Sequence, residues 1–449
     1  MTAEKISQKT YSLFLLLIFL LLLLLCTASC NTIDPPPDKA VFTLTLEDVS
    51  CTEAWITLTT NNLQLPTTIN LLKDNTITKT ISLQTADTLL YIDSLLPNQT
   101  YKFHSVIQSI NHSSNEISVI TMDTTSHAFT FQTWTFGTIG SSSLYDAAII
   151  SENNIWCVGE ILVADSSPNG YTMYNAVHWD GNDWNLKRIF FPTVCGSSNL
   201  TSYPAKAIFA FDDGQIWISS AGDKIAILEN GVQVDKFCLP SNVSMSINKI
   251  WGTSGNDLYV VGNGGNIAHY NGSQWTKIES GTSLPIRDIW GDFNTKTNKY
   301  EILAVAAEID INMGSKVLRI EDNSVTEESN IGLSWDVGGI WFKSGSKYYV
   351  AGAGIHYKHS LNDSIWNRYP QGIVTNYTGD GIRGNNVNDV FATGSFLEIA
   401  HFNGVSWHNY FNVLSSWSGV LGRPAVKGNL MVAGGSEGSS ALVVIGRRN

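Results

Sequence analysis

Charged residues are scarce in this chain, and cations are scarcer than anions. Only 15% of the 449 residues are charged, and 27 Lys and Arg are outnumbered by 39 Asp and Glu. This balance argues against nucleic acid as a principal partner, because phosphate binding needs clustered cations. The hydrophobic fraction of 43% rules out a disordered or fibrous chain and is enough for a large core.

Motifs for enzymatic chemistry are also scarce. The sequence has no G-x-x-x-x-G-K-[ST] phosphate loop, no H-E-x-x-H and no C-x-x-C pair for zinc. A sialidase-type site would need several arginines around a substrate carboxylate, and no three converging arginines can be recognised after residue 128. The sequence therefore predicts no catalytic residue, no cofactor and no metal site. Whether the protein is an enzyme stays open.

Long apolar runs are limited to the N-terminus. Lys5 and Lys9 precede an unbroken apolar run at 13–25, which is followed by Cys26-Thr27-Ala28-Ser29-Cys30. The run is shorter than the roughly 20 residues that a membrane-spanning helix needs, so the pattern is typical of a secretory signal. Plain cleavage and an uncleaved signal anchor are the alternatives.

The small residues before Cys30 resemble the lipobox of bacterial lipoproteins. The resemblance implies a signal peptide at 1–29 and lipid attachment at Cys30, which would hold the protein on a membrane. Asn31 rather than Asp follows, which in that family favours the outer membrane, on its periplasmic or its surface side. The predicted location is therefore the cell envelope.

Cysteine is rare in the rest of the chain, which contains only Cys51, Cys157, Cys195 and Cys238. Four cysteines in an oxidising compartment permit three pairings. Cys195 and Cys238 stand close to Gly or Pro and outside the strongest strand patterns, whereas Cys157 lies inside an apolar strand. We interpret Cys195 and Cys238 as a possible disulfide.

Two modules follow the anchor. Residues 30–40 include Pro35-Pro36-Pro37 and are predicted to form a stiff spacer, and 41–125 contain short alternating or β-branched segments typical of strands. Within this module Leu95, Pro97 and Tyr101 resemble the tyrosine corner of fibronectin type III domains. The resemblance implies a β-sandwich, in which Trp55 would be a core residue.

From residue 128 to the end, the sequence repeats at intervals of about 40 residues. One clear unit contains Ile250-Trp251-Gly252, then Asp257 to Gly262, then His269-Tyr270-Asn271-Gly272 and Trp275. A four-strand unit of this length cannot bury both faces of its sheet alone, so the units must pack face to face. The predicted architecture is a seven-bladed β-propeller, all-β and closed into a ring.

The two ends of the repeat region are incomplete in complementary ways. The last unit ends at Val444-Ile445-Gly446 without a fourth strand, and an unpartnered strand pattern at 129–134 precedes the first unit. We therefore predict that these ends share a composite closing blade. The Trp-Gly, Val-Gly and His-Tyr-Asn-Gly pattern is similar to that of BNR-like and kelch-like propellers of bacterial surface proteins. Because such propellers host both binding proteins and hydrolases, the resemblance implies a fold and not an activity.

Few residues are candidates for chemistry. His178, His269 and His401 occupy one slot in blades one, three and six, and we assign them to blade packing rather than to a metal. Glu308 and Asp310 could pair as acid and base, although a solvated loop is favoured. We thus expect a non-catalytic, lipid-anchored protein whose propeller binds a glycan or protein partner. The alternative is an envelope glycoside hydrolase or polysaccharide lyase with carboxylates on loops.

Overall fold

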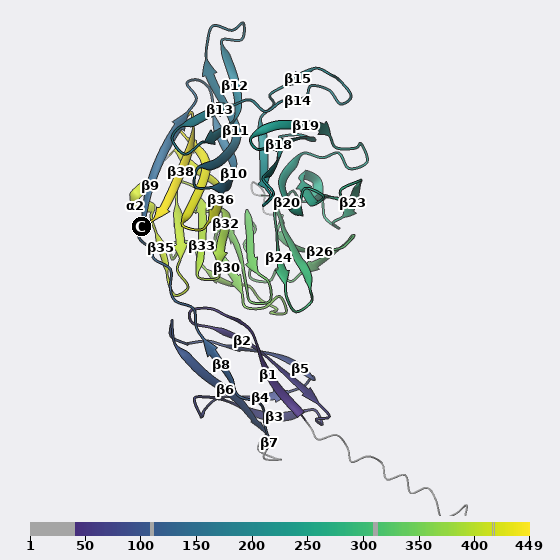
Figure 1. The fold of residues 1–449 in the computed structure, drawn as a ribbon, viewed down its shortest axis with the longest axis vertical. Coiled ribbons are helices and arrows are strands. Elements are labelled where there is room, and N and C mark those ends of the chain that lie inside the picture. Colours follow the sequence, from purple (N-terminus) through teal and green to yellow (C-terminus); the bar gives the residue numbers. More distant parts are fainter. Residues whose placement is uncertain (1–40, 108–111, 309–312, 415, 417) are drawn as a thin grey trace, which may run out of the picture.

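The computed structural model describes residues 41–449 apart from 108–111, 309–312, 415 and 417, so the predicted signal peptide, Cys30 and the spacer lie outside the described residues. Almost all the regular structure is antiparallel β-sheet (Figure 1). Among the described residues the exceptions are the short helices η2 (Asn263–Gly265) and α2 (Phe411–Leu414). No helix within the described ranges is long and apolar enough to cross a membrane.

The described residues after 128 form seven four-stranded sheets, which are the blades of the predicted propeller. Blade 1 contains β10 (Ser143–Ser151), β11 (Asn154–Ala164), β12 (Tyr171–Trp179) and β13 (Trp184–Lys187). Blade 2 contains β16 (Ala205–Ala210), β17 (Gln215–Ser220), β18 (Lys224–Glu229) and β19 (Val232–Cys238). Blade 3 contains β20 (Ile247–Ser254), β21 (Asp257–Gly262), β22 (Asn266–Tyr270) and β23 (Trp275–Glu279).

The remaining blades have the same strand order. Blade 4 contains β24 (Ile286–Asn294), β25 (Lys299–Ala307), β26 (Ser315–Glu321) and β27 (Ser324–Glu328). Blade 5 contains β28 (Gly339–Lys343), β29 (Lys347–Gly352), β30 (Gly354–Lys358) and β31 (Asn367–Tyr369). Blade 6 contains β32 (Gly379–Asn386), β33 (Asp389–Gly394), β34 (Ile399–Phe402) and β35 (Trp407–Asn409), and blade 7 begins with β36 (Gly419–Lys427), β37 (Leu430–Glu437) and β38 (Ser440–Arg448).

The ring closes through a strand from the beginning of the repeat region. β9 (Phe129–Phe136) pairs with β38 in antiparallel register, from Phe129 opposite Arg448 to Phe136 opposite Ala441. This strand completes blade 7, so the predicted composite blade is confirmed. A small hairpin of β14 (Phe191–Pro192) and β15 (Leu200–Thr201) stands between blades 1 and 2.

The Trp-Gly pattern of the repeats has a packing reason. A Cβ atom added to Gly291 of blade 4 would lie 2.3 Å from the Trp251 ring of blade 3. The same relation joins Gly384 of blade 6 to Trp341 of blade 5, at 2.9 Å. Only glycine allows the indole of one blade to lie this close to the innermost strand of the next, because any side chain would collide with it.

The turns before the fourth strands follow the predicted Asn/Asp-Gly chemistry. Gly272 has a φ of +86°, and the Asn271 side chain accepts the backbone N–H groups of Ser273 and Gln274 at 3.1 and 3.0 Å. Equivalent side-chain acceptors are Asp180 in blade 1 and Asn403 in blade 6. The side chain thus fixes the turn while glycine supplies the positive φ.

The N-terminal module (β1 to β8) consists of two sheets over one core. One sheet has the order β1 (Val41–Val49), β2 (Ala54–Asn61), β5 (Asp87–Ile92), and the other contains β4 (Thr76–Leu83), β3 (Thr67–Lys73), β6 (Thr100–Ile107), β7 (His112–Ser113) and β8 (Ile117–Ile120). Side chains of both sheets, among them Ile56, Ile69 and Phe103, form the shared core. The Tyr101 hydroxyl accepts the backbone N–H of Leu96 at 2.9 Å and so ties the start of β6 to the chain five residues upstream.

Trp55 does not belong to that core, and this corrects the sequence-based expectation. The alternation of β2 directs Ala54, Ile56 and Leu58 into the module, so Trp55 faces the other way. It is fully buried because the propeller covers it, and its Nε1 donates to the carbonyl oxygen of His359 at 2.8 Å. The burial of this tryptophan therefore marks an interface.

A buried ion pair lies at the same interface. The Glu53 carboxylate pairs with the Lys347 ammonium of β29, and both side chains are 10% exposed or less. The Tyr91 hydroxyl donates to Glu53 at 2.7 Å, and its ring stacks on His359 with centroids 4.1 Å apart. Burial alone would raise the pKa of Glu53, but the Lys347 charge together with the hydrogen bonds from Lys347 and Tyr91 outweighs burial and lowers that pKa below its ordinary value.

Replacing Glu53 by glutamine is expected to lower the free energy of unfolding by about 3 kcal/mol, because Lys347 would keep a buried charge without its counterion. Urea unfolding measures the loss of stability, and limited proteolysis of the link between module and propeller shows whether the interface has loosened.

In the native protein the stability that the Glu53–Lys347 pair contributes should disappear as the pH falls through the lowered pKa of Glu53, since the stabilising state is the ionised one. The exposed pair of Glu47 with Lys296 is the control, and Glu47→Gln should cost less than about 1 kcal/mol. Equal losses in both variants would contradict the prediction.

Candidate functional site

The first strand of every blade faces the propeller axis. Neighbouring first strands contact one another around the whole ring, from β10 to β16 and onward to β36, which contacts β10 again. Sequence positions that are equivalent in these strands therefore meet around a central channel. One such position holds Asp146 in blade 1, Lys249 in blade 3 and Asp288 in blade 4.

Buried ion pairs cross this channel between blades that are not neighbours. The Lys249 ammonium lies 2.6 Å from both carboxylate oxygens of Asp146. Asp288 accepts two hydrogen bonds of 2.7 Å from Arg383 of blade 6, and the Arg423 Nε of blade 7 lies 3.6 Å from it. Each carboxylate also accepts a backbone N–H from the next blade, so its second oxygen is satisfied.

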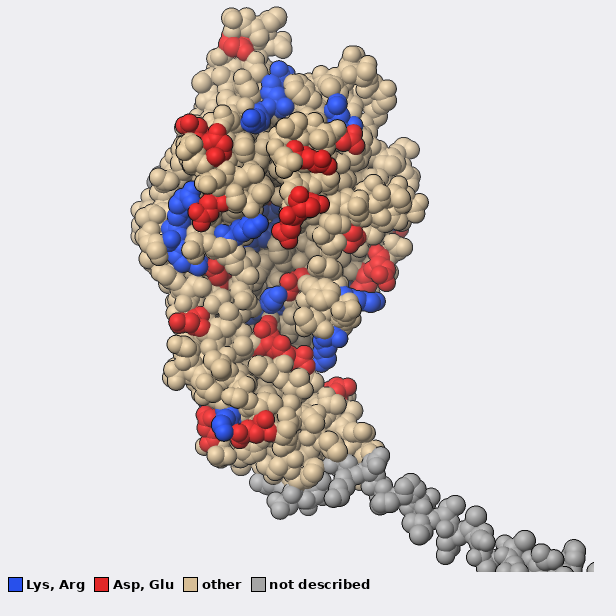
Figure 2. Space-filling view, in the orientation of Figure 1, with Lys and Arg blue, Asp and Glu red and all other residues tan. Residues whose placement is uncertain are grey.

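These pairs divide the channel into two cavities. One, of about 280 Å³, has mainly apolar walls that include Phe209, Trp251 and Trp290. The other, of about 360 Å³, lies at the beginning of the first strands; we call it the mouth cavity. In Figure 2, blue Lys and Arg side chains reach into the hollow at the centre of the propeller, beside red ones.

The mouth cavity is lined by three cations and one carboxylate, namely Lys206, Arg287, Arg423 and Asp380. Lys206 Nζ lies 4.3 Å from the centre of the Tyr145 ring. Burial and, to a smaller extent, the charges of Arg423 and Arg287 together lower the pKa of Lys206 to about 8. Burial also raises the pKa of Asp380, against the influence of the same three cations.

The convergence of arginines was not expected from the sequence. Arg287, Arg383 and Arg423 all come from first strands, and the Asp288 carboxylate contacts the last two. Arg423 also donates to the carbonyl oxygen of Arg287. The expectation of no converging arginines is therefore wrong, because residues far apart in sequence meet only once the ring has closed.

Only one member of the predicted acid–base pair lies within the described residues. Glu308 pairs with Arg287 at 3.3 Å, at the edge of the mouth cavity, and Asp310 lies outside the described residues. Ser436 lies in the mouth cavity within the sequence Gly434-Gly435-Ser436-Glu437-Gly438. A G-x-S-x-G serine nucleophile needs a strand-to-helix turn, whereas this segment is the end of β37 and a hairpin turn.

The three repeated histidines stay apart, each inside its own blade. Each ring stacks on an aromatic residue of the second strand: His178 on Trp156, His269 on Tyr259 and His401 on Phe391. Each Nε2 also meets a polar side chain at the start of that strand, at 2.7 to 3.0 Å. The contact of His401 Nδ1 with His127 Nδ1 at 2.8 Å was not foreseen.

A disulfide joins Cys195 and Cys238, with Cα atoms 5.8 Å apart. It ties the segment around β14 and β15 to the outer strand of blade 2. Cys51 and Cys157 are free and buried. Among described residues, the one cluster with metal-ligand spacing is Asp223 with the two bonded cysteines, whose sulfurs are already used.

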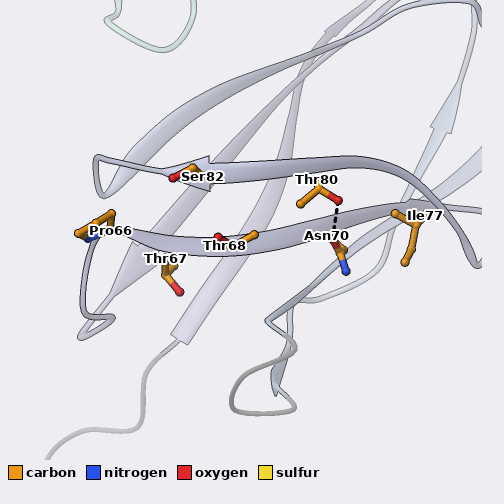
Figure 3. A pocket seen from close by; sticks show the side chains of 7 residues that line it. All are labelled: Pro66, Thr67, Thr68, Asn70, Ile77, Thr80 and Ser82. Carbon is orange, nitrogen blue, oxygen red and sulfur yellow. Dashed lines mark hydrogen bonds between the residues drawn. The ribbon is translucent and has the colours of Figure 1, made fainter.

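A third hollow lies on the N-terminal module, over β3 and β4 (Figure 3). Its lining is uncharged and rich in hydroxyl and amide groups, such as Thr68, Asn70, Thr80 and Ser82. Thr80 donates to Asn70 at 2.8 Å, as the dashed line in Figure 3 shows. With no titratable group in its lining, this hollow is not an acid–base site.

Comparison with known proteins supports the ring architecture. No protein-family model and no curated protein matches the sequence. Among solved structures, "YCF48 bound to D1 peptide" aligns with a TM-score of 0.51 and 14% identity over 70% of this chain and 94% of that chain. The Cps50 (Swd1) β-propeller domain of Myceliophteria thermophila has a TM-score of 0.46 and 11% identity over 71% of this chain and 100% of its own. The seven four-stranded sheets and the likeness to the first of these structures show that the chain contains a β-propeller.

Proposed function

We propose that this is a non-catalytic protein of the bacterial cell envelope, attached to the outer membrane through a lipid on Cys30, whose propeller binds a protein partner. In this proposal the N-terminal module is a fibronectin type III-like sandwich that separates the propeller from the membrane. The Tyr101 hydrogen bond supports that assignment. The peptide-bound state of the YCF48 structure favours a protein over a glycan as the partner.

The observation that carries the proposal is the placement of the N-terminal module on the propeller. The module contacts the turns that begin second and fourth strands, through Lys347, Asn388 and Asn403. The mouth cavity lies at the opposite ends of the strands. β1 runs from Val41 to the propeller contact at residues 49–53, so the chain enters the module far from the propeller (Figure 1). A lipid on Cys30 would therefore leave the mouth side facing away from the membrane.

Lipid attachment is tested by replacing Cys30 with alanine in cells. The native protein should be found in the outer-membrane fraction and incorporate a labelled fatty acid. The variant should lose the label and leave the membrane fraction. A labelled Cys30→Ala protein that still fractionates with the outer membrane would contradict the anchor.

The partner side is tested with a photo-crosslinking amino acid placed at one position at a time. Position 194, 65% exposed in native form, lies on the segment that leads to the mouth end of β16. Position 75, in the β3–β4 turn of the module, is the control. Crosslinks to one protein from position 194 and none from position 75 are expected; the reverse would overturn the proposal.

One observation favours a second candidate, a polysaccharide lyase. Lys206 has a lowered pKa and stands beside two arginines, and a lyase needs cations to hold a uronate carboxylate and a base to remove the neighbouring proton. The electrons of that C–H bond then form a double bond while the glycosidic oxygen leaves. Incubation with polyuronates should give unsaturated products from the native protein and none from Lys206→Met. If the native protein gives no such products, this candidate is excluded.

A further inference from the structure

We infer that the mouth cavity is a carboxylate-binding site and that its ligand group is an acidic side chain of the protein partner. The inference deepens the proposed function and rests on it for the identity of the partner. The sequence did not reveal this site, because its cations come from blades 2, 4 and 7 and are far apart along the chain.

Positive charge is in excess at this site. Lys206, Arg287 and Arg423 face a single lining carboxylate, that of Asp380. Glu308 neutralises part of the Arg287 charge from the edge, at 3.3 Å. The protein as a whole has a formal net charge of -12, so this concentration of cations opposes the general charge of the molecule. A local site of that kind selects an anion.

Two of these cations are incompletely satisfied by the described residues. Lys206 Nζ has no hydrogen-bonded or ion-paired acceptor there, and its close contact is the face of Tyr145. Arg423 Nε is buried and has no hydrogen-bond partner, because the Asp288 oxygen is 3.6 Å away. A bound carboxylate would supply acceptors to both groups in a site of low dielectric, where charge-assisted hydrogen bonds are strong.

The shape of the cavity favours a side chain over a polymer. The ion pairs of Asp288 with Arg383 and Arg423 cross the channel between this cavity and the apolar one. Its volume of about 360 Å³ is at the low end of ligand pockets, which are about 300–1,000 Å³. A side chain enters such a cavity end first, whereas the interior of a polysaccharide chain would need a groove that is open at both ends.

Binding should depend on pH through Lys206. The groups that face it are Tyr145, Arg287, Asp380, Arg423 and, from below, Asp146. With a pKa of about 8 in the empty site, the ammonium is present at neutral pH and is lost as the pH rises. Affinity for a carboxylate should therefore fall through this range. Lys206→Arg keeps its charge at every pH used, so its affinity should not fall there.

The test is ligand-observed NMR with N-acetylglutamate α-amide, which has one carboxylate on its side chain. The neutral N-acetylglutamine α-amide is the matched control ligand, and the methyl glycoside of galacturonate represents a sugar acid. The native protein should bind the glutamate compound alone. Lys206→Met, which keeps the length of the side chain, should weaken binding on the order of tenfold or more.

Lys427→Met is the control variant, since it removes the same charge at the opposite end of the channel and should not change the affinity. Binding of the sugar acid alone would overturn the assignment to a protein side chain. No binding of either acid, or equal loss in both variants, would overturn the carboxylate site. If the carboxylate site is overturned in either way but the native protein is still crosslinked to a partner from position 194, the proposed partner binding stands without this site. If the glutamate compound binds and no partner is crosslinked, the proposed function fails and the site remains.

Discussion

Replacing Asp288 by asparagine is expected to lower the free energy of unfolding of the propeller by about 3–5 kcal/mol. Its carboxylate is fully buried and compensates Arg383 through two hydrogen bonds and Arg423 through a longer contact. The amide would leave both guanidinium groups without a counterion in a site that water does not reach. Urea unfolding followed by tryptophan fluorescence measures the loss, because the propeller contains nearly all the tryptophans.

The control for this variant is an exposed ion pair in the same propeller. Glu279 is 82% exposed and pairs with Lys277 at 2.8 Å, so Glu279→Gln should change stability by less than about 1 kcal/mol. Adding Arg383→Met to Asp288→Asn should recover part of the loss, since one uncompensated charge is removed. A loss for Asp288→Asn no larger than that for Glu279→Gln would show that the cross-channel pair does not stabilise the ring.

Truncation of the chain after residue 437 is expected to abolish cooperative folding of the propeller. The truncated chain lacks β38, which lies between β37 and β9 and holds the two ends of the ring together. Leu442, Val443, Val444 and Ile445 are at most 1% exposed. Burying each contributes about 1.5–3 kcal/mol, so their sum is comparable with the whole stability of a typical domain, about 5–15 kcal/mol.

Size-exclusion chromatography and thermal unfolding by circular dichroism measure this effect. The truncated protein should elute as aggregates and show no cooperative transition, since its open blades expose apolar strands. Removal of Asn449 alone is the control and should leave both measurements unchanged. The milder variant Val443→Asp should also destabilise strongly, because it places a carboxylate in the same core. A monomeric truncated protein with a cooperative transition would contradict closure by β38.

The blades were predictable because each is made by local signals. Alternating apolar residues form the strands, and turns such as Asn271-Gly272 set the hairpins within a few residues of one another. Closure was predictable for a similar reason, since a missing strand at one end and a spare strand at the other are both visible in the repeat.

The mouth cavity was not predictable, because its cations lie where strand pairing is irregular. Lys206, Arg287 and Arg423 each stand where the pairing of a first strand with the second strand shifts register, and simple strand alternation does not show such a shift. Their neighbours across the axis depend in addition on the number of blades. Trp55 was misjudged for a related reason. Strand alternation shows that Trp55 and Ile56 lie on opposite faces of β2. Which of these faces packs against the second sheet of the N-terminal module, and which against the propeller, depends on where that second sheet lies.

Charged pairs cross the propeller axis below the mouth cavity, so a group that enters beside Lys206 meets Asp288 and its arginine partners. If the proposed partner inserts a side chain there, that side chain can leave only together with the partner that covers the mouth. The dissociation rate of such a complex is then set by withdrawal of the whole partner rather than by escape of one side chain. For the proposed complex, residence time, more than the strength of any single contact, is the property that this arrangement would control.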